Sequence, residues 1–226
     1  MLSVPRPVAA PACEPPGAWP WTEPASTVSS LAFVAAGAWI LVAAGRDDGR
    51  VPARAALGAL TVLIGVGSVV QHGPAPAWNP VLHDPPLLGA LALVAADAVA
   101  DLRGRPVSAW WWLGPTLADV VLAAVSPAAS VVAQVAAAAV AVAATLLRAC
   151  ARPALRRRLL TAAAVLGAGA AVGRLSRPGW PLCEPGGWAV LSGHAVWHVL
   201  AAGALVVLAP AVGSRVRPGP PPGRGT

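Results

Sequence analysis

The feature that most limits the fold is a series of seven apolar runs, each about long enough to cross a bilayer. The hydrocarbon core of a membrane is about 30 Å thick, and a helix of about 20 apolar residues spans it. The chain is 57% hydrophobic and only 11% charged, which is not the composition of a soluble domain with a polar surface. We therefore expect an all-α membrane protein, a seven-transmembrane helix bundle, with spans near residues 26–45, 56–72, 85–101, 108–126, 128–147, 159–174 and 187–209.

The arginines are unevenly distributed among the segments outside these runs. Thirteen of the sixteen basic residues follow the first, third, fifth or seventh run, whereas Arg6, Arg174 and Arg177 lie on the other side. Since cytoplasmic loops carry the excess of positive charge, the N-terminus is predicted outside the cell and the C-terminus in the cytoplasm. The chain then divides into an extracytoplasmic N-terminal segment (1–25), without an apolar core of signal-peptide length, a transmembrane domain (26–209) and a disordered cytoplasmic tail (210–226).

Several polar side chains lie in the outer half of the predicted membrane region. In "LSGHAVWHVL", His194 and His198 are four residues apart and therefore share one face of a helix. In "GVGSVVQH", Ser68 and His72 have the same spacing at the outer end of the second run, and Asp84 follows at the outer start of the third. Because an ionisable residue inside a membrane is costly, each is a functional-site hypothesis.

Together these residues have the composition of a catalytic zinc site. Such a zinc typically has three protein ligands and an open position for water, whose pKa it lowers to about 7. We expect His72, His194 and His198 to be the ligands of Zn²⁺, and a water that the zinc activates to be the attacking group. Asp84 is then the general base, and Ser68 donates to the developing oxyanion.

Two alternatives to this assignment stay open. The histidines can be unrelated packing residues that are hydrogen-bonded in a helix core. His83 is a rival for the place of His72 or Asp84, although it lies two residues before Pro85 at the mouth of the predicted third span and has no polar partner one helical turn away.

The same motifs resemble the alkaline ceramidases, a family within the CREST superfamily of seven-helix membrane hydrolases, which also includes progestin and adiponectin-type receptors. The likeness is carried by "GVGSVVQH", the following Asp84, "HAVWH" in the last span and "CEPPGAWPWTEPASTVSSLAF" near the N-terminus; the intervening helices match only in hydrophobicity. The resemblance implies a zinc-dependent hydrolase that cleaves the amide of a ceramide-like lipid. The histidine and serine motifs are specific for the superfamily and not for its substrate.

The resemblance also implies a calcium site in the N-terminal segment. Glu14 and Glu23 could correspond to its acidic ligands, whereas Pro15 and Pro16 stand where further ligands are expected. The alternative is that both glutamates are solvated residues of an outer loop. Possible Ca²⁺ binding is therefore an expectation from the resemblance alone.

A disulfide between Cys13 and Cys183 is a further implication of the resemblance. Both cysteines are predicted on the outer side, where an oxidising compartment allows the bond to form. The alternative is two free thiols. Cys150 falls in an inner loop and is expected to stay an inert thiol.

Other polar and aromatic residues have structural interpretations. Asp101 is expected to meet Arg103 or Arg105 at the inner interface, and Asp119 to bond another helix rather than a metal. Trp197, between the two histidines of the last run, points to a different face and is expected to pack. The sixth run, "LLTAAAVLGAGAAVGR", is built of small residues that suit close packing against neighbouring helices.

The sequence thus predicts an intramembrane zinc-dependent lipid amidase in a bacterial plasma membrane, acting on a membrane lipid and with no role in binding nucleic acid. A non-catalytic seven-helix receptor or transporter is the alternative, because it needs the three histidines but not Asp84 beside an open coordination site. A purely structural zinc, closed by a fourth protein ligand, is another.

Overall fold

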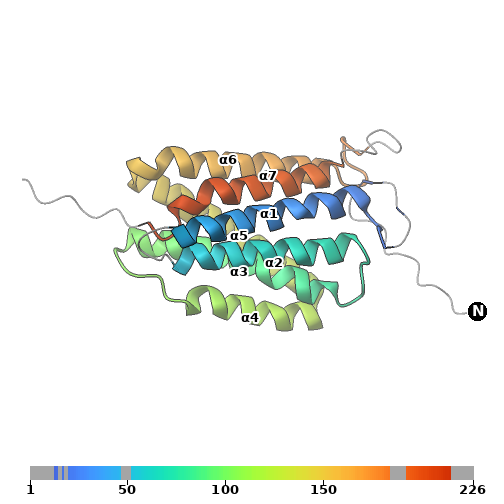
Figure 1. Ribbon diagram of the computed structural model, residues 1–226, viewed down its shortest axis with the longest axis horizontal. Helices are drawn as coiled ribbons and strands as arrows, with labels where there is room; N and C mark the ends of the chain where they lie inside the picture. Colours follow the sequence, from blue (N-terminus) through green and yellow to red (C-terminus); the bar gives the residue numbers. More distant parts are fainter. Residues whose placement is uncertain (1–12, 15–16, 18–19, 47–51, 184–191, 215–226) are drawn as a thin grey trace, which may run out of the picture.

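Seven long helices form a bundle in the computed structural model, which describes residues 13–14, 17, 20–46, 52–183 and 192–214 (Figure 1). Six of the helices are long and apolar enough to cross a membrane, with α7 counted together with the short 3₁₀-helix that follows it (Gly193–Ala211, 19 residues), whereas α4 has only 16 residues. The predicted all-α membrane architecture is confirmed for these residues. The helices are α1 (Pro24–Arg46), α2 (Pro52–His72), α3 (Asn79–Leu102), α4 (Trp110–Val125), α5 (Pro127–Ala151), α6 (Pro153–Leu175) and α7 (Gly193–Leu208), followed by the 3₁₀-helix η1 (Ala209–Ala211).

The start of α3 differs from the prediction. The helix begins at Asn79 and runs through Pro85 and Pro86, so that His83 and Asp84 lie within it rather than at its mouth. A proline removes the hydrogen bond to the carbonyl four residues earlier. Here the two prolines lie in the second turn, so the helix loses only bonds to first-turn carbonyls and continues.

One of those freed carbonyls, that of Leu82, faces α2 at Gly67. A Cβ on Gly67 would lie 2.8 Å from this oxygen and 2.7 Å from the Cα of His83. Glycine is therefore required for the approach of α2 to the start of α3. This contact brings Ser68 to the same level of the bundle as His83 and Asp84.

The last helix begins at Gly193 because Ser192 caps it. The Ser192 side chain accepts a hydrogen bond of 3.0 Å from the backbone N–H of Ala195, as an N-cap residue does. The earlier part of the predicted span, residues 187–191, lies outside the described residues, as do most of the N-terminal segment (1–12, 15–16 and 18–19) and most of the tail (215–226).

Small residues allow α6 to pack closely on α7, as the sequence predicts. A Cβ on Gly173 would lie 3.0 Å from the Cβ of Trp197, and a Cβ on Gly169 would lie 3.0 Å from the indole ring. The expectation that Trp197 packs on a different face of the helix from His194 and His198 is also confirmed. This packing fixes the rotation of α7, and with it the direction of its histidines.

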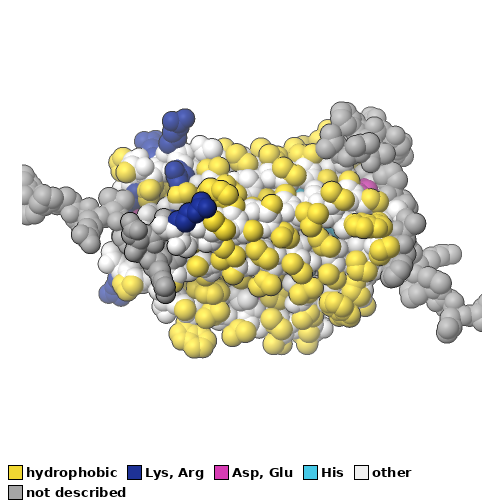
Figure 2. Space-filling view, viewed as in Figure 1, with side chains coloured by type: hydrophobic (Ala, Val, Ile, Leu, Met, Phe, Trp, Pro, Cys, Tyr) yellow, Lys and Arg dark blue, Asp and Glu magenta, His cyan; other side chains and the backbone are white. Residues whose placement is uncertain are grey.

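The two ends of the bundle carry different side chains (Figure 2). Arginines gather at one end, and the histidines lie toward the other; we call these the arginine end and the histidine end. Between them the surface is apolar, and large hydrophobic side chains such as Trp39, Val135 and Leu147 are exposed. This surface is that of a multi-pass membrane protein, because only lipid accepts so much exposed apolar area. The arginine end comprises Arg46, Arg54, Arg103, Arg105, Arg148, Arg152 and Arg156 to Arg158, and the histidine end comprises His72, His83, His194 and His198.

A buried ion-pair cluster fastens the arginine end. Arg148 of α5 is 2% exposed and donates to Asp97 at 2.9 Å and to Asp101 at 2.8 Å, and Arg152 also contacts Asp101. The prediction that Asp101 pairs with Arg103 or Arg105 is therefore wrong, because Arg148 and Arg152 bind Asp101 instead. Arg148 also donates to the carbonyls of residues 211 and 214, which ties down the segment after α7.

Candidate metal centre

Three histidines from two helices meet at the histidine end. His72 is the last residue of α2, and His194 and His198 lie one turn apart on α7. One nitrogen atom of each ring lies within 4.8 Å of the others. The Nε2 atoms of His72 and His194 are 3.3 Å apart, and the three ring centroids are separated by 4.6 to 5.0 Å. The structure therefore brings together all three predicted ligands.

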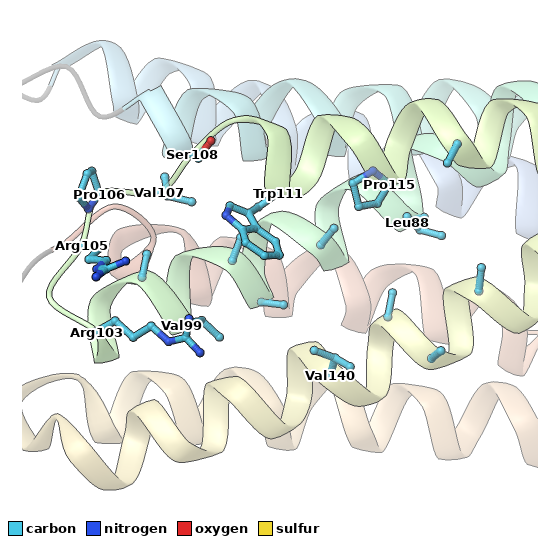
Figure 3. A pocket seen from close by; sticks show the side chains of 18 of the residues that line it. Leu88, Val99, Arg103, Arg105, Pro106, Val107, Ser108, Trp111, Pro115 and Val140 are labelled. Atoms are coloured by element: carbon cyan, nitrogen blue, oxygen red, sulfur yellow. The ribbon is translucent and has the colours of Figure 1, made fainter.

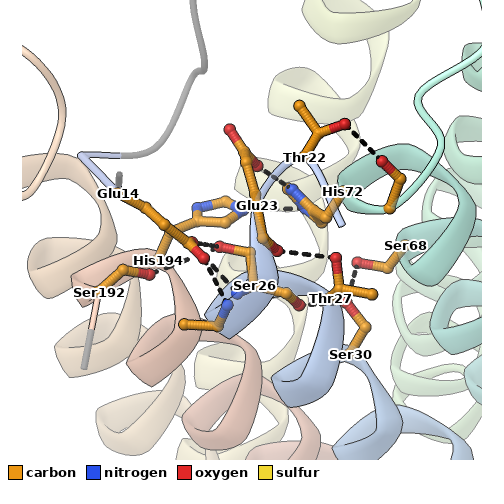
Figure 4. Close-up of polar contacts among 12 residues, drawn as sticks. Glu14, Thr22, Glu23, Ser26, Thr27, Ser30, Ser68, His72, Ser192 and His194 are labelled. Carbon is orange, nitrogen blue, oxygen red and sulfur yellow. Dashed lines mark hydrogen bonds and ion pairs between the residues drawn. The ribbon is translucent and has the colours of Figure 1, made fainter. Parts of the chain in front are cut away.

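The ring of His72 is oriented by Glu23 (Figure 4). The Glu23 carboxylate only accepts hydrogen bonds, so Nδ1 of His72 carries the proton and donates it. In addition, the backbone N–H of Glu23 donates to the carbonyl of His72 at 2.8 Å, and Thr22 donates twice to the carbonyl of Gly73. These contacts hold the start of α1 against the end of α2. Because the proton of His72 is on Nδ1, its Nε2 atom carries a lone pair, and this atom faces His194.

His198 is oriented by the serines of α1. Its Nδ1 atom lies 3.2 Å from the carbonyl oxygen of Ser26 and 2.9 Å from the Oγ of Ser29. A carbonyl only accepts, so this nitrogen also carries the proton, and Ser29 in turn donates to the same carbonyl. The tautomer that remains has its lone pair on Nε2, the nitrogen on the opposite side of the ring.

The donor set fits zinc. Two imidazole nitrogens that both present lone pairs repel each other at 3.3 Å unless a proton or a cation lies between them. Zinc–nitrogen bonds of about 2.0–2.1 Å in a tetrahedral site place two ligand nitrogens about 3.3 Å apart. Metal-bound histidines also generally donate the other ring N–H to a carboxylate or a carbonyl. His72 and His198 both do so.

Ser68 lies next to this histidine cluster. It is 1% exposed, and its Oγ is 2.9 Å from the Oγ of Ser30 on α1, which in turn is 3.4 Å from Nδ1 of His198. The spacing of four residues places Ser68 one turn below His72 on α2. Ser68 is thus joined to the histidines through the serine-rich start of α1.

Asp84 belongs to a second polar group on the side of α3 that faces α5. Its Oδ1 lies 2.7 Å from Nδ1 of His83, and its Oδ2 accepts a hydrogen bond of 3.1 Å from Ser130. Gln134 donates to Ser130 at 3.1 Å. His83 is therefore a partner of Asp84 and does not belong to the histidine cluster that could hold a metal.

Asp119 of α4 lies beside this second group. It is fully buried, and Ser130 and Asp84 influence it electrostatically. Within the described part of the chain, neither of its carboxyl oxygens has a hydrogen-bond partner at normal distance. It is not part of the three-histidine cluster, and its interaction with Ser130 links it to another helix, α5.

Glu14 caps the first helix. Its carboxylate accepts hydrogen bonds from the backbone N–H of Ala25, from that of Ser26 at 3.2 Å and from the Ser26 hydroxyl at 2.7 Å. An anion at this position also interacts favourably with the positive end of the helix dipole. Both glutamates proposed for calcium are buried and bonded to protein groups, Glu14 to α1 and Glu23 to His72. Calcium binding stays a prediction.

The predicted disulfide is present. Cys13 and Cys183 are bonded across 170 residues, with their Cα atoms 5.5 Å apart, and Cys150 is a free, exposed thiol. The bond joins the residue before Glu14 to the segment that follows α6. It thus holds the N-terminal segment close to the residues that orient the histidines.

No protein-family model and no curated protein matches the sequence of this chain.

Proposed function

We propose that the protein is an intramembrane zinc-dependent hydrolase that cleaves the amide bond of a ceramide-like N-acyl lipid. The observation that carries this proposal is the convergence of His72, His194 and His198, two of which have the Nδ1 proton held by a protein acceptor. A buried site in which three imidazoles lie this close together suits a divalent metal better than it suits helix packing.

Zinc at this point would supply a Lewis acid, which polarises a carbonyl and lowers the pKa of a bound water. The protein residues then have separate tasks. Glu23 and the carbonyl of Ser26 hold two ligand rings in the tautomer that leaves Nε2 free. Ser68 provides a hydroxyl beside the histidine cluster, where a developing oxyanion needs a donor.

Asp84 is the carboxylate that we assign as general base. It lies on α3 directly after His83, whose backbone contacts α2 beside Ser68. The hydrogen bonds from Ser130 and His83 fix its orientation. A carboxylate held in this way takes a proton from the attacking water and later returns it to the leaving amine.

The surroundings of the site support a lipid as the substrate. The histidines lie on helices whose outer surfaces are apolar, so a substrate reaches them most directly from the bilayer. We further infer that the histidine end faces outside and the arginine end the cytoplasm of a bacterial plasma membrane. The positive-inside rule and the disulfide near the histidine end support this orientation.

A non-catalytic receptor or transporter is the second candidate. It is favoured by one observation, that the hydrogen bonds of Asp84 go to His83 and Ser130 and not to a histidine of the cluster. A receptor would bind an N-acyl lipid without releasing its fatty acid.

The test is the substitution Asp84→Asn in the purified full-length chain. Zinc content and thermal stability are measured first, and then the release of fatty acid and amine from a panel of N-acyl lipids. General acid–base help is typically worth about 10²- to 10⁴-fold in rate, and we expect a loss of that size with zinc retained. Ser68→Ala is expected to retain zinc and to lower kcat by about 10²- to 10³-fold at most.

Full activity of the Asn variant would remove Asp84 from its role and make His83 the next residue to substitute. A wild-type protein that binds the lipids and hydrolyses none would favour the receptor. Full zinc content in His194→Ala and His198→Ala would refute the metal centre itself.

A further inference from the structure

A groove lies between α3, α4 and α5, and Arg103 and Arg105 of the arginine end line one end of it (Figure 3). Its volume is about 700 Å³, within the range of small-molecule sites. It exists because the helix faces around it carry mostly alanine, such as Ala96 of α3 and Ala137 of α5. In addition, α4 packs loosely over the groove, since only two of its sixteen residues, Asp119 and Ala123, are buried.

The length of the groove suits one acyl chain. Its lining on α3 extends from Leu88 to Ala100, and at about 1.5 Å per residue this is roughly 18 Å along the helix axis. Half of a hydrocarbon core of about 30 Å has nearly the same depth. A lipid tail from one leaflet therefore fits along it.

Two arginines lie at one end of this apolar groove. Arg103 and Arg105 are exposed, and in the described part of the chain neither side chain forms an ion pair or a hydrogen bond. Their neighbours at the same end, Arg148 and Arg152, are bound to aspartates of α3. Trp111, whose indole is typical of the membrane interface, lines the same end of the groove.

We propose that this groove binds an anionic phospholipid of the leaflet at the arginine end. The phosphate and the anionic head group contact Arg103 and Arg105, whose guanidinium groups suit bidentate contacts with phosphate. One acyl chain lies along the alanines of α3 and α5 beneath α4. The proposal does not rest on the hydrolase centre, whose Asp84 lies one turn beyond the far end of the groove.

The positive charges of Arg103 and Arg105 at the end of the groove favour an anionic phospholipid over other occupants. A zwitterionic or uncharged lipid would fill the apolar part equally well but would leave both arginines without a partner. The acyl chain of a substrate would enter from the opposite end, where Asp84 lies one turn from Leu88 on the same face of α3. A second copy of the chain would need an acidic surface for the arginines.

The experiment compares dioleoyl phosphatidylglycerol with dioleoyl phosphatidylcholine, which have the same tails. Binding to the purified full-length chain is measured by native mass spectrometry. We expect the wild type to prefer phosphatidylglycerol by about 10- to 30-fold, the effect of two cations close to an anionic head group. Arg103→Gln/Arg105→Gln should lose this preference while still binding both lipids weakly.

Two further variants sharpen the test. Arg46→Gln/Arg156→Gln removes two exposed charges from the same end but none from the groove, and it should keep the preference. Ala137→Phe fills the groove and should weaken the binding of both lipids.

Equal binding of the two lipids by the wild type would overturn the proposal, and so would an equal loss of preference in both arginine variants. Displacement of phosphatidylglycerol by an uncharged N-acyl lipid at equal concentration would assign the groove to substrate instead. A lipid-free dimer that Ala137→Phe dissociates would assign it to a second copy of the chain.

Discussion

Glu23 offers the sharpest test of how the histidine cluster is built. Its carboxylate accepts the Nδ1 proton of His72, and the exposures of the two side chains are only 3% and 1%. The substitution Glu23→Gln keeps a neutral acceptor of similar size and removes the charge. The backbone hydrogen bond from residue 23 to His72 is unaffected, so α1 should stay docked on α2.

The expected loss follows from the strength of this hydrogen bond. A bond to a charged group contributes about 1.5–3 kcal/mol, roughly twice as much as a neutral one, so Glu23→Gln should cost about 0.8–1.5 kcal/mol of zinc binding. At 1.4 kcal/mol per tenfold, this is a loss of affinity of about 4- to 12-fold. Glu23→Ala removes the bond entirely and should approach the 100-fold loss found for partners of metal ligands.

The assay is a zinc titration of the metal-stripped protein against a competing chelator. Glu14→Gln is the matched control, because Glu14 is also buried at this end of the bundle but touches none of the three histidines. It should lower the unfolding temperature through the lost helix cap and leave zinc affinity nearly unchanged.

The reasoning fails if Glu23→Gln binds zinc as tightly as the wild type, or if Glu14→Gln loses as much affinity. A different outcome would support the calcium interpretation. If the two glutamates form a calcium site, both variants should weaken Ca²⁺ binding equally, with the zinc affinity of each unchanged.

Two more predictions concern the stability of the bundle and its covalent link. Arg148→Met leaves Asp97 without this buried partner and should cost about 3–5 kcal/mol, measured by thermal unfolding in detergent, whereas the exposed Arg156→Gln should change stability by less than about 0.5 kcal/mol. In native membranes without reductant, only Cys150 should react with a permeant alkylating reagent, and labelling of Cys13 would contradict the disulfide.

The two histidine-containing pairs are predictable from sequence because the arrangement within each pair is local. A spacing of four residues places His194 and His198 on one helix face, whatever the rest of the chain does. The same holds for Ser68 and His72. What brings the two pairs together is the packing of α1 against both α2 and α7, which spacing alone does not contain.

The role of Glu23 is not local, and the sequence did not reveal it. The residue lies 49 positions before His72, and the contact depends on how the start of α1 docks on the end of α2. The only sequence signal at this position is a carboxylate just before a serine-rich predicted span, and the resemblance assigned this carboxylate to a calcium site. The ion pairs of Arg148 were missed for the same reason, since they join α5 to α3 across about fifty residues.

The hydrogen bonds around Asp119 depend on the position of one proton, which a sequence pattern cannot predict. Ser130 gives its one hydrogen to Asp84 and accepts one from Gln134, so a single lone pair remains on its oxygen. Asp119 can join this network only as a donor, which requires the proton to lie on its own carboxyl group. The chain from Asp119 to Ser130 to Asp84 then closes through the Ser130 hydroxyl. The burial of Asp119 without a cation favours this arrangement, because an ionised carboxylate deep among apolar helices has no compensating charge.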